Sequence, residues 1–329
     1  MVVSPAFRSK FVESSVKLLE DYGLDGLDID YEYPQNHEQA RGYTELLREL
    51  RHALDQHQRK KEIDYRFLLT VCVVSRYAVD TSLICLCRLP RLVVHRTTKS
   101  CTSLRWTVTS IFGTSWHTTM VRLVSLIPPN RILICVPHPA GSWDSISGHQ
   151  ANIHGEPISG TKAVAFYHSK GVPRHKLILG IPLYGRSFMN TDGPGKPFSG
   201  IGPGSWEKGV YDYRALPLPG SYMFRDERMM ASWSYDYDKK EMITFDSEEV
   251  ARWKGEWIKH EGLGGSMFWE LSGDKGTERK DMEGGPGKDP QPGRSLVKVV
   301  KDAMGPLDST HNWLRYEGSK FENMRKGME

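Results

Sequence analysis

The chain has 329 residues, enough for one large domain or two modest ones, and its formal net charge is +4. Hydrophobic residues make up 39% of the chain and it contains nine Trp, a composition that excludes global disorder. No run of about 18 apolar residues occurs, which excludes a membrane-spanning helix. The N-terminal stretch is typical of an amphipathic helix and lacks the apolar segment of a signal peptide, so we expect no such signal within the chain.

Charge and cysteines are unevenly distributed. Residues 72–135 contain eight Lys and Arg and one acid, Asp80, whereas the remainder of the chain is acidic overall. The same window contains one of the 31 glycines, Gly113, and all five cysteines: Cys72, Cys85, Cys87, Cys101 and Cys135. An odd number of cysteines without a C-x-x-C pair gives poor support for a disulfide framework or a metal site, and we expect no metal and no other cofactor. We interpret residues 72–139 as an anomalous segment, foreign to the rest of the chain.

Outside this segment, predicted helices alternate with short apolar strands. Gly23 ends the first helix and Pro34 closes the strand that follows it. The expected helices cover residues 5–21, 38–60, 160–173 and 247–260, and the expected strands cover 24–32, 67–71, 176–185 and 264–271. This alternation predicts an α/β fold with a parallel sheet, and strands of this apolarity suit a barrel. Residues 187–246, rich in Gly, Pro, Tyr and Trp, are typical of antiparallel ribbons and predict a small α+β insertion.

The predicted strand "GLDGLDIDYEYP" (residues 23–34) is crowded with acids. Because side chains alternate across a strand, Asp28, Asp30 and Glu32 share one face, and apolar side chains occupy the other. Glu32 would stand at the C-terminal rim, where barrels of this kind keep their chemistry. Stacked carboxylates share protons, which raises the pKa of at least one of them. A protonated carboxylic acid is what cleavage of a glycosidic bond requires.

Two other interpretations of the acidic strand remain open. A D-x-D-x-D run can be a calcium loop, but such a loop needs a Gly turn and a bidentate acid at its twelfth position, and here β-forming residues and Pro34 surround the acids. A solvated acidic edge strand is the second alternative, and the apolar residues on the alternate face argue against it.

The stretch "DGLDIDYEYP" resembles the D-x-x-D-x-D-x-E signature of family 18 glycoside hydrolases, the chitinases. Five further segments are similar to parts of filamentous-fungal chitinases in the same order: "GHQANI", "ILGIPLYGRSF", "SGIGPGSWEKGVYDY", "SYDYDKKEMITFD" and "GLGGSMFWELSGD". The resemblance covers about residues 5–71 and 140–329. It implies a (β/α)8 TIM barrel, incomplete in this chain, built from residues 1–186 and 247–329, and a chitinase insertion domain at 187–246.

The resemblance also implies an activity, that of a glycoside hydrolase of the endochitinase type. Such an enzyme cleaves β-1,4 links between N-acetylglucosamine units of chitin with retention, by a substrate-assisted mechanism. By resemblance, Glu32 protonates the leaving oxygen and the N-acetyl carbonyl of the substrate attacks the anomeric carbon. Asp30 would stabilise the resulting oxazolinium, and Asp28 would tune the proton balance.

The substrate contacts are implied in the same way. The residues concerned are Asp25, Tyr33, Tyr184, Arg186 and Trp269. Without the motif, Trp269 could be a core residue and Arg186 half of a surface ion pair. Trp143 and Trp206 line the cleft or are packing residues, and the sequence leaves both alternatives open. The resemblance implies an extracellular monomer that binds chitin and chito-oligosaccharides and has no nucleic-acid or membrane partner.

The sequence departs from the family pattern in two ways. The family has three strands ahead of the acidic strand, whereas this chain starts in the helix just before it. The sixth strand should carry M-x-Y-D, whose Tyr and Asp hold the N-acetyl group, and residues 72–139 contain no such motif. In a shifted frame, the codons from Arg105 to Met120 permit a reading that contains M-A-Y-D, which indicates an unspliced intron beside a shifted exon. A mature transcript that keeps codons 72–139 in the printed frame would contradict this hypothesis.

We therefore expect the chain as written to be truncated, poorly folded and inactive. The presence of Glu32 favours an enzyme lineage over a non-catalytic chitin-binding lectin of the same fold. An inactive remnant is the third alternative.

Overall fold

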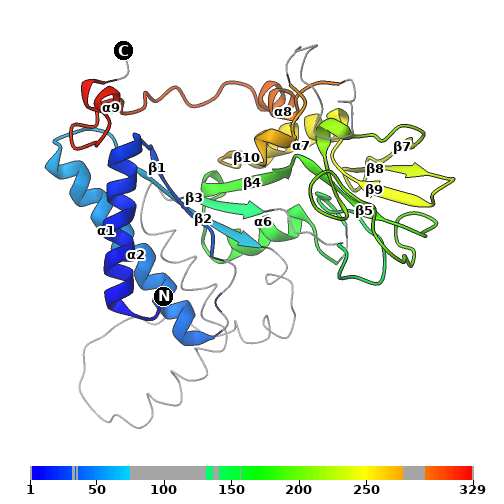
Figure 1. Cartoon of the computed structure of the whole chain (residues 1–329), viewed down its shortest axis with the longest axis horizontal. Coiled ribbons are helices and arrows are strands. Elements are labelled where there is room, and N and C mark those ends of the chain that lie inside the picture. The colour runs from blue at the N-terminus through cyan, green and yellow to red at the C-terminus, as the bar shows by residue number, and fades with distance from the viewer. Residues whose placement is uncertain are drawn as a thin grey trace, which may run out of the picture.

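A computed structural model describes residues 2–31, 34, 36–74, 131–135, 141–155, 157–276 and 293–327. These residues form two five-stranded sheets (Figure 1), one in the order β1-β2-β3-β4-β10 and one in the order β6-β5-β9-β8-β7. The strands of the first sheet are β1 (Gly26–Ile29), β2 (Leu68–Val74), β3 (Arg131–Cys135), β4 (Leu177–Pro182) and β10 (Gly265–Trp269). Those of the second are β5 (Tyr184–Phe188), β6 (Val210–Asp212), β7 (Tyr222–Asp226), β8 (Ala231–Asp236) and β9 (Glu241–Thr244). The α-helices are α1 (Pro5–Tyr22), α2 (His37–Lys60), α6 (Gly160–Ser169), α7 (Glu248–Glu261), α8 (Leu296–Met304) and α9 (Glu322–Lys326).

The first sheet is parallel throughout, which confirms the prediction of a parallel α/β sheet. All six residues of the inner strand β4 are buried, as expected for a strand covered on both faces. The outer strands β1 and β10 are only partly buried. Within the described residues no strand joins β1 to β10, so the sheet stays open and no closed barrel forms.

Two predicted strands differ from those observed. The acidic strand is shorter than residues 24–32, since β1 ends at Ile29. The predicted strand 176–185 is two strands, β4 and β5, which belong to different sheets. The chain changes sheet at Leu183, whose N–H donates to the carbonyl of Trp269 (2.7 Å) and whose carbonyl accepts from the N–H of Tyr213 (2.9 Å). The antiparallel sheet therefore begins three residues before the predicted insertion.

Two parts of the anomalous segment lie in the parallel sheet. β2 continues to Val74, and β3 lies between β2 and β4 and pairs with both. The rest of the segment, with Cys85, Cys87, Cys101, Gly113 and the codons from Arg105 to Met120, lies outside the described residues. Strand β3 was not predicted, because we took the whole of residues 72–139 to be foreign.

The helices α1, α2, α6 and α7 lie where they were predicted, although α6 ends at Ser169, and α8 and α9 were not predicted. α1 has Pro5 in its first turn and ends at Gly23, which adopts the left-handed conformation (φ 65°) that favours glycine. The side chain of Asn36 caps α2 by accepting from the N–H of Gln39 (2.9 Å). α1 and α2 lie side by side at the β1 end of the parallel sheet (Figure 1). Across the part of the chain that the structure describes, no helix is both long and apolar enough to cross a membrane.

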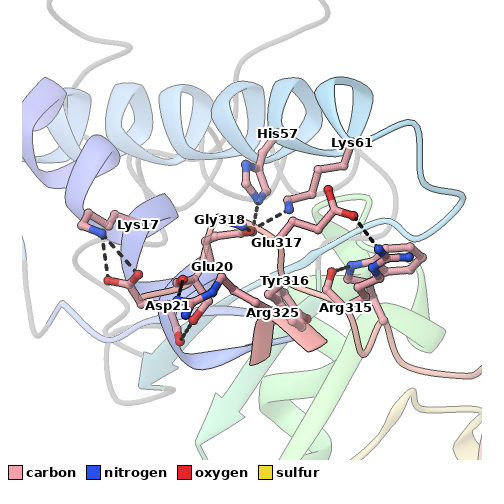
Figure 2. A network of polar contacts seen from close by, with 12 residues as sticks. Lys17, Glu20, Asp21, His57, Lys61, Arg315, Tyr316, Glu317, Gly318 and Arg325 are labelled. Atoms are coloured by element: carbon pink, nitrogen blue, oxygen red, sulfur yellow. Dashed lines mark hydrogen bonds and ion pairs between the residues drawn. The ribbon is translucent and has the colours of Figure 1, made fainter. Parts of the chain in front are cut away.

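The C-terminal segment returns to the first helix. From α8 it runs across the molecule to α9, beside the end of α1 (Figure 1). Figure 2 shows the polar network that holds it there. The carboxylate of Glu20 accepts from the N–H of Gly318 (2.7 Å) and from Lys61 Nζ (2.6 Å), and it lies 2.9 Å from His57 Nε2. Next to it, Asp21 accepts from the N–H of Lys320 (3.0 Å).

We expect acid to loosen this C-terminal segment. Partial burial by itself raises the pKa of Glu20, but the hydrogen bonds from Lys61, Gly318 and His57 outweigh burial and hold that pKa below its ordinary 4.5. A lowered carboxyl pKa contributes stability above pH 4.5 that is lost as pH falls through the folded pKa. Burial lowers the pKa of His57, which acts in the same direction below pH 6.5.

Amide hydrogen exchange of residues 311–327 as a function of pH measures this effect. Protection should fall at acidic pH, and Glu20→Gln should lower it at neutral pH by about 1–3 kcal/mol, since a buried acceptor of charged donors is lost. Glu322→Gln, at an exposed site in the same segment, is the matched control. Unchanged protection in Glu20→Gln would show that this carboxylate does not hold the segment.

Candidate active site

Two of the predicted catalytic acids, Asp28 and Asp30, lie at the carboxyl end of β1. Asp28 is in the strand and its Oδ1 accepts from Thr70 Oγ1 of the neighbouring strand (2.5 Å). Asp30 follows directly after the strand. Glu32 and Tyr33, the predicted proton donor and one predicted sugar contact, lie outside the described residues.

The neighbourhood of these acids favours the protonated form of Asp30. Surrounding protein removes part of the water from Asp30, and the charge of Asp28 adds to this, so the pKa of Asp30 lies above its ordinary value. Beneath them, the hydroxyl of Tyr43 donates to the carbonyl of Ile29 (3.1 Å). Burial, followed by the charges of Asp28 and Asp30, raises the pKa of Tyr43, which keeps this phenol protonated as a donor.

A cavity of about 250 Å³ opens between the two sheets at the carboxyl ends of β4 and β10. It brings together three of the predicted substrate contacts, Tyr184, Arg186 and Trp269. Trp269 is 64% exposed, which excludes the alternative that it is a core residue. The other lining residues are Leu183, Trp206, Glu207, Val210, Asp212, Glu270 and Gly273.

Arg186 is held by aromatic rings. Its guanidinium carbon lies 4.9 Å from the ring centroid of Trp143 and 5.6 Å from that of Tyr184. Its Nε atom is buried and has no hydrogen-bond partner among the described residues. The side-chain amide of Gln150 donates to the carbonyl of Tyr184 (2.7 Å) and so fixes the start of β5.

Sequence reasoning did not single out three polar lining residues, Glu207, Asp212 and Glu270. Glu207 and Asp212 lie within the segment "SGIGPGSWEKGVYDY", whose resemblance to fungal chitinases is the signal that could have found them. Trp206, left open above, lines the cavity and is 69% exposed, so it is not a packing residue.

Asp25 lies away from the other predicted contacts. It precedes β1 and therefore lies at the amino end of the sheet, opposite Asp30. Its Oδ2 accepts from Asn312 Nδ2 of the C-terminal segment (2.8 Å). Burial raises the pKa of Tyr65 to about 12, and the charge of Asp25 and its hydrogen bond with Tyr65 contribute to this shift. These contacts are structural ones.

The acids of β1 and the residues that line the cavity lie at the same rim of the parallel sheet, but at its two opposite edges. Parallel strands end on the same side of a sheet, so Asp30 at the end of β1 and Trp269 at the end of β10 lie on the rim where ligands bind in α/β folds. β1 and β10 are, however, the two outer strands of the open sheet. Neither Asp28 nor Asp30 is among the described residues that line the cavity. In the same part of the chain, no group of three or more His, Cys, Asp or Glu side chains is placed to hold a metal ion.

Comparisons with known proteins point to one family. Residues 1–274 match the family described as Glycosyl hydrolases family 18. Chitinase 1 of Aphanocladium album is 34% identical over 99% of this chain and 66% of its own length, and Endochitinase 1 of Metarhizium robertsii is 33% identical over 98% and 66%. The chain thus spans about two thirds of the length of these relatives. A mutant class V chitinase from Nicotiana tobaccum, solved in complex with NAG4, superimposes with a TM-score of 0.69 at 20% identity over 93% of this chain and 76% of that one. This likeness shows a TIM-barrel-like α/β fold.

Proposed function

The chain belongs to glycosyl hydrolase family 18, and from this premise we propose that its lineage is that of a chitinase of the endochitinase type. The substrate is chitin or its oligosaccharides, cleaved at β-1,4 links between N-acetylglucosamine units. The observation that carries the proposal is the convergence of Tyr184, Arg186 and Trp269 on one cavity at the carboxyl rim of the parallel sheet. An exposed Trp and an Arg on the wall of one cavity are suited to a sugar ring, which offers a C–H face for the indole and hydroxyl groups for the guanidinium.

The proposed mechanism is retaining and substrate-assisted. Glu32 donates its proton to the leaving oxygen, and the N-acetyl carbonyl of the substrate attacks the anomeric carbon. Asp30 stabilises the oxazolinium that results, while Asp28 shares its proton. The raised pKa of Asp30 supports this assignment, because such sharing needs one carboxyl that holds a proton more tightly than usual.

We further propose that the antiparallel sheet is the chitinase insertion domain, at about residues 184–246 and so beginning at β5. Residues 1–183 and 247–329 would then form the barrel part. By family membership we propose an extracellular site of action and a monomer.

For the chain as written, the geometry favours binding over turnover. The acids of β1 and the cavity beside β10 lie at opposite edges of an open sheet. Catalytic groups need to be held to within about 0.5 Å of their productive positions, and a sheet that stays open within the described residues supports such positions less rigidly than a closed barrel does. We therefore propose that the 329-residue chain retains the sugar-binding cavity and is impaired in hydrolysis.

Binding and hydrolysis measured side by side test this proposal. The reference is a grafted chimera, Chitinase 1 of Aphanocladium album in which residues 5–71 and 140–276 of this chain replace their counterparts. The 329-residue chain should bind the N-acetylglucosamine tetramer and cleave a fluorogenic chito-oligosaccharide at least about 10²-fold more slowly than the chimera. Equal rates would contradict the proposed impairment, and a chimera without chitinase activity would contradict the proposed function.

A further inference from the structure

Trp206 is an exposed aromatic residue on a well-fixed turn. The N–H of Ser205 donates to the carbonyl of Val210 (2.8 Å), and the N–H of Val210 donates to the carbonyl of Glu207 (3.0 Å). The N–H of Gly209, in the left-handed conformation (φ 79°), donates to the carbonyl of Gly202 (2.7 Å). The backbone of this turn therefore holds a large apolar side chain, 69% exposed, at the edge of the cavity.

A pair of charged residues fixes the indole ring. Nε1 of Trp206 donates to Oδ2 of Asp212 (3.0 Å). The same oxygen accepts from Nε of Arg214 (3.1 Å) and lies 2.9 Å from its Nη2. The side chain of Asp212 is 14% exposed and that of Arg214 is 26% exposed, whereas the hydrogen bond to the indole lies at an exposed position. Asp212 also pairs with Tyr184 across β6 and β5, which puts its side chain on the cavity face of the antiparallel sheet.

We propose that Trp206 is a second aromatic contact for the sugar chain, beside Trp269, and that Asp212 and Arg214 are positioning residues that fix its ring. The inference rests on the proposed function and adds to it. A large exposed side chain loses rotational freedom when it binds a ligand, and a ring already fixed by a hydrogen bond loses less. The ligand class is the pyranose ring of a β-1,4-linked N-acetylglucosamine oligomer, whose C–H face packs on the indole.

Oligosaccharide binding by the unchanged 329-residue chain and its variants tests the inference. Trp206→Ala should weaken binding of the N-acetylglucosamine tetramer about tenfold or more. Asp212→Ala should weaken it about three- to tenfold in the chain with Trp206, and change it less than about twofold in a chain that carries Trp206→Phe. The Phe side chain is aromatic but has no N–H group, so Asp212 cannot accept a hydrogen bond from it.

Two further variants distinguish positioning from general damage. Asp212→Asn keeps an acceptor for the indole N–H and should bind within about twofold of the unchanged chain. Asp192→Ala removes an exposed carboxylate from the loop after β5 and is the matched control. An equal loss from Asp212→Ala in the chains with and without Trp206→Phe would overturn the positioning role, because Asp212 would then act on the sugar directly or through another residue.

The outcomes separate this inference from the proposed function. If Trp269→Ala abolishes binding while Trp206→Ala leaves it unchanged, the proposed function stands and the inference is wrong. If the unchanged chain binds no tetramer, the proposed function of this chain fails and Trp206 is not a sugar contact. The proposed role of Asp212 in fixing the Trp206 ring can still be tested separately, by NMR measurement of hydrogen exchange at the Trp206 indole N–H. Slow exchange that becomes fast in Asp212→Ala supports it, and equal rates overturn it.

Discussion

Glu32→Gln is expected to lower hydrolysis of chito-oligosaccharides by about 10²–10⁴-fold and to leave their binding unchanged. The amide has nearly the shape of the carboxylic acid but no proton to give to the leaving oxygen. The measurement is turnover of a fluorogenic chito-oligosaccharide by the grafted chimera, with tetramer binding measured on the same preparations.

The control for this variant is Glu256→Gln, which removes an exposed carboxylate of α7 that pairs with Arg252. It should leave both turnover and binding unchanged. Near-normal turnover by Glu32→Gln would show that another group protonates the leaving oxygen. Loss of binding in Glu32→Gln would show instead that Glu32 holds the ground-state sugar.

Lys254→Met is expected to destabilise the chain by about 3–5 kcal/mol. Lys254 of α7 and Asp246 are both buried, and Lys254 Nζ lies 2.5 Å from Asp246 Oδ2. Burial raises the pKa of Asp246 and lowers that of Lys254, so each ion depends on the other for its charge. Removal of Lys254 leaves an uncompensated buried carboxyl. Urea unfolding at neutral pH measures the change in the free energy of unfolding.

The double variant Lys254→Met with Asp246→Leu separates this cause from lost packing. Since both charges are then absent, it should be more stable than Lys254→Met alone. Arg252→Met breaks an exposed pair on the same helix and should cost less than about 1 kcal/mol. A double variant no more stable than Lys254→Met would contradict the buried-charge explanation.

Local sequence patterns predicted α1, α2, α6, α7 and most parallel strands because the signals are local, but they did not predict α8 and α9. Gly23 and Asn36 mark helix ends through backbone conformation and a side-chain cap, and both act within a few residues of their position. All six residues of the apolar stretch "LILGIP" are buried in β4, and a continuous hydrophobic run predicts such a buried strand. The convergence of Tyr184, Arg186 and Trp269 followed from the family resemblance, and the structure places these three around one cavity.

Other features depend on contacts between distant segments, which a single sequence does not reveal. The division of residues 176–185 into two strands depends on Leu183, whose N–H donates to the carbonyl of Trp269 and whose carbonyl accepts from the N–H of Tyr213. The family resemblance implied that Asp25 contacts the substrate, whereas the structure shows a hydrogen bond to Asn312, which is far along the chain. Strand β3 was not predicted because its short apolar run, "ILIC", lies in a segment of unusual composition. Its place between β2 and β4 depends on pairing with both of these strands.

Calorimetric titration of the unchanged 329-residue chain with the N-acetylglucosamine tetramer is the most direct test of the central claim, a chitin-type binding site built around Trp269. We predict saturable binding that Trp269→Ala abolishes. Absence of binding to the unchanged chain, or equal binding by Trp269→Ala, would contradict this claim.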